Sequence, residues 1–125
     1  MSELVIVTNN PDVAAKYPGL SSYREGSVLN IYEAVRDEVH KGAQVVSHPL
    51  SGSIKPNQTP YKSVVITNPH GPLNFASLQI IEDAISVLRR LPTINRCLDE
   101  SILADFRIID LDHISAAIKI DFMGI

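Results

Sequence analysis

The chain has no tryptophan and one cysteine, Cys97, and aromatic residues make up only 6% of it. A single cysteine excludes a disulfide within the chain, which fits a reducing compartment. Without other support for a reactive thiol, we interpret Cys97 as a small buried or surface residue. Because aromatic residues are scarce, the core must be built from Val, Ile, Leu and Ala.

Long apolar runs and clusters of basic residues are also missing. The N-terminal apolar run covers only residues 4–7, which is too short for a signal peptide or a membrane span. The net charge is −3, and the tightest basic pair, Arg89 and Arg90, falls at a predicted helix end. We therefore expect a cytoplasmic protein with no nucleic-acid partner and no membrane partner.

The length of 125 residues and the hydrophobic content of 45% predict a single domain, residues 1–125, with one core. Strands are expected where short apolar runs are bounded by turn residues, and helices where apolar residues recur every three or four positions. The predicted strands are 4–7, 43–47, 63–67 and 106–111, and the predicted helices are 28–41 and 75–91. Residues 12–17 and 101–105 are predicted helical turns. The tail 112–125 fits both types, and we favour a helix.

This order of elements, β-α-β-β-α-β, predicts the α/β class. Strands that alternate with helices usually lie parallel, and runs such as SVVIT at 63–67 are typical of strands buried on both faces. We expect a mostly parallel four-stranded sheet, flanked by helices in a two-layer or three-layer domain.

Polar residues follow three of the predicted strands. Asn9 and Asn10 follow the first, His48 follows the second, and His70 lies just beyond the third. In open α/β sheets, ligands bind beyond the carboxyl ends of the strands. If the strands are parallel, these side chains share one edge and form a polar pocket.

The loop at residues 48–62 is unusually long for a compact domain, and such loops are often functional. Its segment Ser51-Gly52-Ser53 can offer backbone N–H groups and hydroxyls to an anion, and Lys55 can supply a positive charge. Three prolines limit its flexibility. We predict that it binds a small carboxylate or phosphate, although a polar loop that covers a sheet edge is an equally good interpretation of its composition. The candidate ligand-binding residues are Asn9, Asn10, His48, Ser51, Gly52, Ser53, Lys55, Asn57, Thr59 and His70.

Catalysis is a second possibility, with His48 or His70 as a base and a serine of the loop as the nucleophile. The chain lacks the P-loop, the G-x-S-x-G elbow and the dinucleotide fingerprint. Asp110 and Asp112 are candidate paired carboxylates beside His113, but a helix-capping turn explains them better. No metal site and no cofactor are expected, and whether the chain is an enzyme stays open.

Several segments resemble one protein family. They are IVTNNP at 6–11, VRDEVHKG at 35–42 and, above all, HPLSGSIKPNQTPYKS at 48–63. Together they are similar to the GrdX family, small proteins associated with glycine reductase gene clusters in amino-acid-fermenting anaerobes. The segments 71–73 and 105–112 are also similar in character.

The resemblance implies an accessory protein linked to glycine, sarcosine or betaine reduction, with glycine reductase components as partners. It implies no catalytic residues. Our leading hypothesis is an accessory protein that binds a small anion. The alternatives are a small hydrolase or transferase, and a protein–protein interaction module that forms a homodimer through helix 75–91 or the tail.

Overall fold

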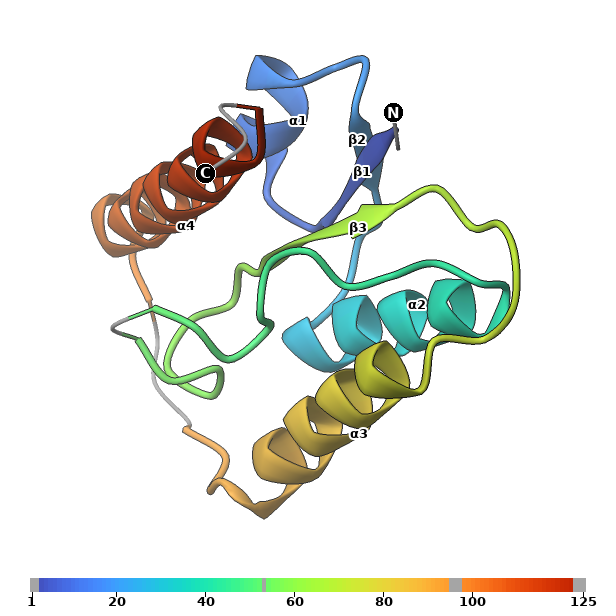
Figure 1. The fold of residues 1–125 in the computed structure, drawn as a ribbon. Helices are drawn as coiled ribbons and strands as arrows, with labels where there is room; N and C mark the ends of the chain where they lie inside the picture. Colours follow the sequence, from blue (N-terminus) through green and yellow to red (C-terminus); the bar gives the residue numbers. More distant parts are fainter. Residues whose placement is uncertain (1–2, 53, 95–97, 123–125) are drawn as a thin grey trace.

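The computed structural model describes residues 3–52, 54–94 and 98–122, with side chains as far as residue 119. Ser53, one of the predicted ligand-binding residues, and Cys97 lie outside the described residues. A three-stranded sheet stands between two pairs of helices (Figure 1). The strands are β1 (Leu4–Thr8), β2 (Ser21–Tyr23) and β3 (Ser63–Thr67). The helices are α1 (Pro11–Lys16), α2 (Val28–His40), α3 (Phe75–Arg90) and α4 (Glu100–Phe122).

The alternation of side chains along the central strand divides the core into two halves. Val7 and Val64 face α2 and α3, whereas Ile6 and Val65 face α1 and α4. Successive residues of a strand point to opposite faces of the sheet, so a run of β-branched residues can serve both halves. The domain is therefore three layers deep, with helices on both sides of the sheet (Figure 1).

The prediction of a mostly parallel four-stranded sheet is wrong. The sheet has the order β2-β1-β3, and β1 pairs in parallel with β2 but antiparallel with β3. The predicted strand 43–47 contributes only an isolated bridge between Val45 and Ile66. The short strand β2 escaped prediction because its sequence, SSY, carries no apolar signal.

The predicted strand 106–111 is also wrong, because these residues lie within α4. Asp99 caps this helix, accepting a hydrogen bond of 3.0 Å from the backbone N–H of Ile102. Its buried positions Asp110, Ile114 and Ile118 recur every fourth residue, while Ile108 and Ile109 are exposed. A short apolar run does not by itself distinguish a strand from a helix. The helix continues to Phe122, which confirms the favoured reading of the tail as far as that residue.

The other helix predictions are confirmed, together with their end signals. Ser27 and Asn30 form a capping box at the start of α2. At its end Gly42 has a φ of +107°, a conformation that favours glycine. A Cβ atom there would lie 2.7 Å from the carbonyl oxygens of His70 and Gly71. Within the described residues, no helix is both long and apolar enough to span a bilayer.

Antiparallel pairing of β1 with β3 decides which polar segments meet. Thr8 lies opposite Ser63, so Asn9 and Asn10 lie beside the end of loop 48–62. His70 follows the other end of β3, at the opposite edge of the sheet. The expectation that all the predicted strand-end residues share one edge is therefore wrong, because it assumed parallel strands.

Asp110 of α4 joins the sheet to helices α1 and α4. One of its carboxylate oxygens accepts hydrogen bonds from the Ser63 hydroxyl (2.7 Å) and the Asn10 side-chain amide (3.0 Å), and the other accepts from the Ser63 backbone N–H (3.1 Å). The carbonyl group of the Asn10 side chain caps α1 through the N–H of Asp12. Asp110 is 8% exposed, so these donors satisfy a largely buried charge.

Replacing Asp110 with alanine is expected to lower the free energy of unfolding by about 2–4 kcal/mol, because buried donors would lose a charged acceptor. Asp112→Ala removes an exposed carboxylate from the same helix and is the matched control, with an expected effect within about 0.5 kcal/mol. Urea denaturation followed by circular dichroism measures both. Equal effects of the two substitutions would contradict the role given to Asp110.

Candidate functional site

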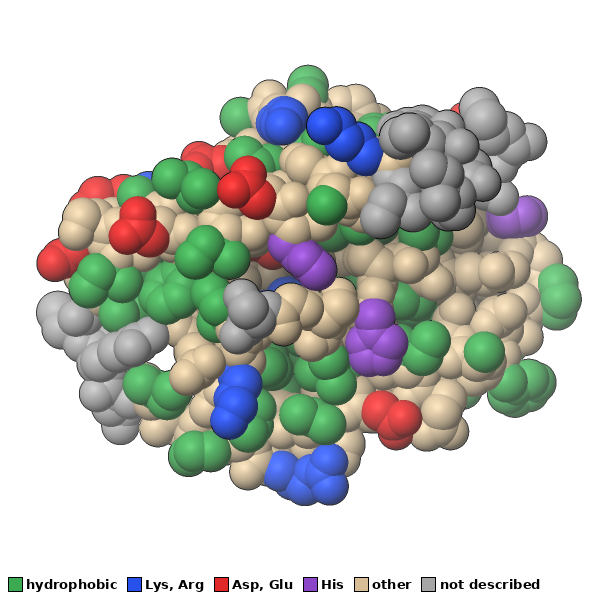
Figure 2. Space-filling model, turned by 60° about the vertical axis from the view of Figure 1, so that its left-hand side comes forward, with side chains coloured by type: hydrophobic (Ala, Val, Ile, Leu, Met, Phe, Trp, Pro, Cys, Tyr) green, Lys and Arg blue, Asp and Glu red, His purple; other side chains and the backbone are tan. Residues whose placement is uncertain are grey.

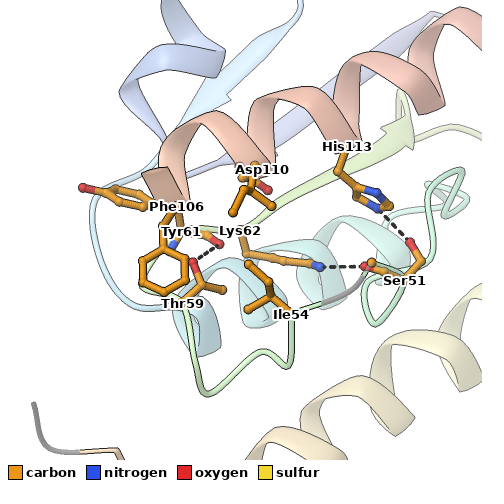
Figure 3. Close-up of a pocket in the computed structure, with 10 residues that line it drawn as sticks. Ser51, Ile54, Thr59, Tyr61, Lys62, Phe106, Asp110 and His113 are labelled. Atoms are coloured by element: carbon orange, nitrogen blue, oxygen red, sulfur yellow. Dashed lines mark hydrogen bonds between the residues drawn. The ribbon is translucent and has the colours of Figure 1, made fainter. Parts of the chain in front are cut away.

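A small pocket lies where loop 48–62 meets α4, and its volume is about 90 Å³ (Figure 3). The loop, which ends at Lys62 just before β3, forms one side, and one face of α4 forms the other. The lining residues are Ser51, Gly52, Ile54, Thr59, Tyr61, Lys62, Phe106, Ile109, Asp110 and His113.

Hydrogen bonds to the rest of the fold hold the loop in place. Tyr32 of α2 donates from its hydroxyl to the carbonyl of Pro49 at 2.7 Å. Asn9 donates from its side chain to the carbonyl of Pro60 at 2.8 Å and accepts from the backbone N–H of Lys62 at 2.8 Å. The described parts of the loop are thus fixed at both ends, which positions the pocket wall before any ligand arrives.

Lys62 supplies a buried cation to the pocket. It is 7% exposed, and its ammonium donates one long hydrogen bond, 3.4 Å, to the carbonyl of Ser51. Burial lowers the pKa of Lys62, and the nearby carboxylate of Asp110 opposes this effect. Within the described residues that carbonyl is the only hydrogen-bond acceptor of an ammonium that carries three protons. Two of its N–H groups therefore remain for a ligand or solvent.

The Ser51 hydroxyl lies between two acceptors and has one proton to donate. Its oxygen is 2.8 Å from the carbonyl oxygen of His48 and 2.9 Å from Nε2 of His113 (Figure 3). If Ser51 donates to the carbonyl, Nε2 of His113 carries a proton and donates to Ser51. If Ser51 donates to His113, the ring proton is on Nδ1. The tautomer of His113 therefore decides whether the serine is activated.

The surroundings of His113 favour the neutral form of its imidazole. Burial lowers the pKa of its imidazole, the positive charge of Lys62 lowers it further, and Asp110 acts in the opposite direction. A neutral imidazole has one nitrogen free to accept a proton. His113 can therefore act as a proton acceptor beside Ser51 near neutral pH.

The outer side of the pocket is apolar, with Ile54, Phe106 and Ile109 among its lining residues. Tyr61 completes this wall, and its hydroxyl accepts a hydrogen bond of 3.0 Å from Arg107. Arg107 also pairs with Glu100, and these two contacts raise the pKa of its guanidinium. Apolar walls around one buried cation lower the local polarizability, which strengthens electrostatic contacts with a ligand.

The predicted site residues fall into three groups. Ser51, Gly52 and Thr59 line the pocket. Asn9 and Asn10 lie beside it, but their side chains hold the backbone and Asp110 in place.

The remaining predicted residues lie away from the pocket. His48 and Lys55 are exposed, and the Asn57 side chain donates to the carbonyl of Pro92. His70 is exposed at the opposite sheet edge, where Nδ1 contacts the carbonyl of Asn68 at 2.9 Å. His48 accepts a hydrogen bond from the backbone N–H of Leu50 at its Nδ1. The imidazole bonded to the loop serine is that of His113, not that of His48 or His70.

Sequence reasoning missed Lys62 and His113 as pocket residues, and it treated Asp110 as part of a capping turn. The spacing of Phe106, Asp110 and His113 is the helical signal that was available, since it puts them on one helix face. A paired carboxylate site is excluded because Asp110 is buried and Asp112 is exposed. Among the described residues, no three His, Cys, Asp or Glu side chains are grouped closely enough to hold a metal ion.

The fold and the pocket define a class of protein: a small three-layer α/β protein with a buried lysine and a serine–histidine pair in one cavity. A family model described as GrdX-like protein matches residues 5–119. The chain therefore belongs to the GrdX-like protein family, which confirms the resemblance of the sequence motifs. No curated protein and no solved structure is significantly similar to the chain.

Replacing Lys62 with glutamine is expected to raise the pKa of His113, because the substitution removes a positive charge that opposes protonation of the imidazole. Lys55→Gln removes the same charge from an exposed position and is expected to leave this pKa unchanged. Nuclear magnetic resonance titration of the imidazole resonances measures both. A His113 pKa that falls in the Lys62 variant would contradict the arrangement of the pocket.

Proposed function

We propose that the protein is an accessory protein of a glycine reductase system that binds a small carboxylate or phosphate in the pocket between loop 48–62 and α4. Family membership supports the first part. The observation that carries the second is the buried Lys62 ammonium, which lines the pocket and has one long hydrogen bond within the described residues. Glycine reductase components are the proposed protein partners, and the proposed location is the cytoplasm.

The charge of the binding site comes from Lys62, and Lys55 takes no part in it. Among the described residues no ion pair joins Asp110 to Lys62, although the charge of the carboxylate opposes the lowering of the Lys62 pKa. The carboxylate accepts its hydrogen bonds from Ser63 and Asn10. An anion can therefore accept from the ammonium without displacing an ion pair. Charge-assisted hydrogen bonds of this kind are stronger than neutral ones.

The size and walls of the pocket limit the ligand. The pocket is small, with a volume of about 90 Å³. A single carboxylate or phosphate group suits a pocket of this size. The Ser51 hydroxyl and the His113 ring lie on the same side as Lys62 and can adjust their shared proton to an incoming oxygen (Figure 3).

Acetate and inorganic phosphate are the probes for this proposal. Each is expected to raise the melting temperature of the wild-type protein in a concentration-dependent way. Lys62→Gln is expected to weaken binding at least about tenfold, which corresponds to about 1.4 kcal/mol. Lys55→Gln, the matched control, is expected to bind like the wild-type protein. Affinity lost in the Lys55 variant but kept in the Lys62 variant would overturn the site.

A second candidate function is a small hydrolase or transferase with Ser51 as the nucleophile. The distance of 2.9 Å between the Ser51 hydroxyl and Nε2 of His113 favours it, because a serine needs a base within hydrogen-bond reach. His113 takes the role that the sequence suggested for His48 or His70. The second acceptor of Ser51, the carbonyl of His48, competes with this role.

A serine-directed fluorophosphonate probe tests this second candidate. It is expected to label Ser51 in the wild-type protein, and about a hundredfold more slowly in His113→Gln, because the base would be lost. His70→Gln is the control with an exposed histidine and is expected to be labelled normally. Peptide mass spectrometry locates the label, and an unlabelled wild-type Ser51 would eliminate the candidate.

The interaction module and the homodimer stay predictions. Phe75 at the start of α3 is 76% exposed, and Ile102, Ile108 and Ile109 of α4 are each at least 40% exposed. Figure 2 shows hydrophobic side chains gathered on the α4 side of the molecule, next to acidic ones. The exposed isoleucines of α4 are side chains that a partner can cover.

A further inference from the structure

Lys62 differs from every other lysine of the chain. The others, Lys16, Lys41, Lys55 and Lys119, are all exposed, whereas Lys62 is 7% exposed and lines a cavity. Burying a lysine without a carboxylate partner is costly, and such residues are rare in structural roles. Buried lysines in apolar pockets are, however, the ones that act as amine nucleophiles.

We propose that Lys62 forms an imine with a small aldehyde or ketone that enters the pocket between loop 48–62 and α4. The inference rests on the pocket of the proposed function, and it assigns to the same side chain a covalent role in addition to anion binding. The ligand class follows from the chemistry of a primary amine. The cavity volume of about 90 Å³ favours small compounds.

The reaction is a condensation that needs no other reactant. The unprotonated Nζ attacks the carbonyl carbon, a C–N bond forms, and the electron pair of the C=O bond moves to oxygen, which takes up a proton. The nitrogen loses one proton to give a carbinolamine, whose hydroxyl group takes up a second proton. The C–O bond then breaks as water leaves, and the nitrogen loses its remaining proton. The products are one C=N bond and one water molecule, with no net oxidation or reduction.

The residues around Lys62 suit both the attack by the amine and the proton transfers that lead to loss of water. Burial lowers the pKa of the ammonium, so more of the amine is unprotonated at neutral pH. Nζ lies beside Ser51, whose hydroxyl and the His113 ring share a proton that can be given to the carbonyl oxygen and taken back. In this reaction Ser51 and His113 transfer the proton to and from the carbonyl oxygen, and Nζ of Lys62 forms the bond to carbon.

The apolar side chains of the pocket are expected to slow hydrolysis of the imine once it has formed. Imines in water revert to amine and carbonyl compound, so a site that retains one must limit the access of water. Ile54, Phe106 and Ile109 line the pocket beside the amine. Tyr61 is held in the same wall by the hydrogen bond from Arg107.

Reductive trapping in the wild-type protein tests the proposal, and the exposed lysines are internal controls. The folded protein is treated with substoichiometric acetaldehyde and sodium cyanoborohydride at neutral pH, and ethylation of each lysine is followed by peptide mass spectrometry. Lys62 is expected to react faster than Lys55, because burial lowers the pKa of the Lys62 ammonium. His113→Gln is expected to slow the labelling of Lys62 and to leave Lys55 unchanged.

Labelling of Lys62 at or below the rate of the exposed lysines would overturn the proposal. Acetate and phosphate binding in the same preparation separates this failure from failure of the proposed function, because a wild-type protein that binds anions without preferential labelling refutes the imine alone. Lys62→Arg keeps the positive charge and removes the primary amine. It is expected to retain anion binding while no ethyl group is found at position 62.

Discussion

The carboxylate of Asp110 is the interaction on which the rest of the structure depends. Through Ser63 it ties α4 to the first residue of β3, and through Asn10 it ties α4 to the cap of α1. These contacts place one face of α4 against the end of loop 48–62. Without them α4 would lose the hydrogen bonds that hold it beside the loop, which Tyr32 and Asn9 fix independently.

The same contacts explain why a lysine can remain unpaired beside a carboxylate. Asp110 accepts hydrogen bonds from Ser63 and Asn10. Its charge lowers the cost of burying Lys62, and among the described residues the two side chains form no ion pair. The charge of Lys62 is therefore partly balanced by Asp110, and its ammonium can still donate hydrogen bonds to a ligand. Anion binding and imine formation are two uses of this one arrangement, one by the ammonium and one by the free amine.

Much of the local structure was predictable, because it depends on neighbours in the chain. Ser27 and Gly42 mark the ends of α2, and runs such as SVVIT at 63–67 give strands. The loop was predicted to be a site from its length and composition. Ser51, Gly52 and Thr59 line the pocket, and ligand binding by them stays a prediction. The positive charge was assigned to Lys55, which is exposed, instead of Lys62, the buried residue just before β3. The sequence gives no sign of which way a side chain at the end of a loop points.

The sequence by itself determined the α/β class, helices α2 and α3, and family membership through its motifs. It also pointed to loop 48–62 as the candidate site. Only the tertiary structure decided that β1 and β3 are antiparallel, which separates His70 from Asn9 and Asn10. It also decided that residues 106–111 are helical, which brings Asp110 and His113 to the pocket. The physical reason is the same in both cases. Strand direction, and the state of a short apolar run, are set by which distant surface each element buries, and that information is spread over the whole chain.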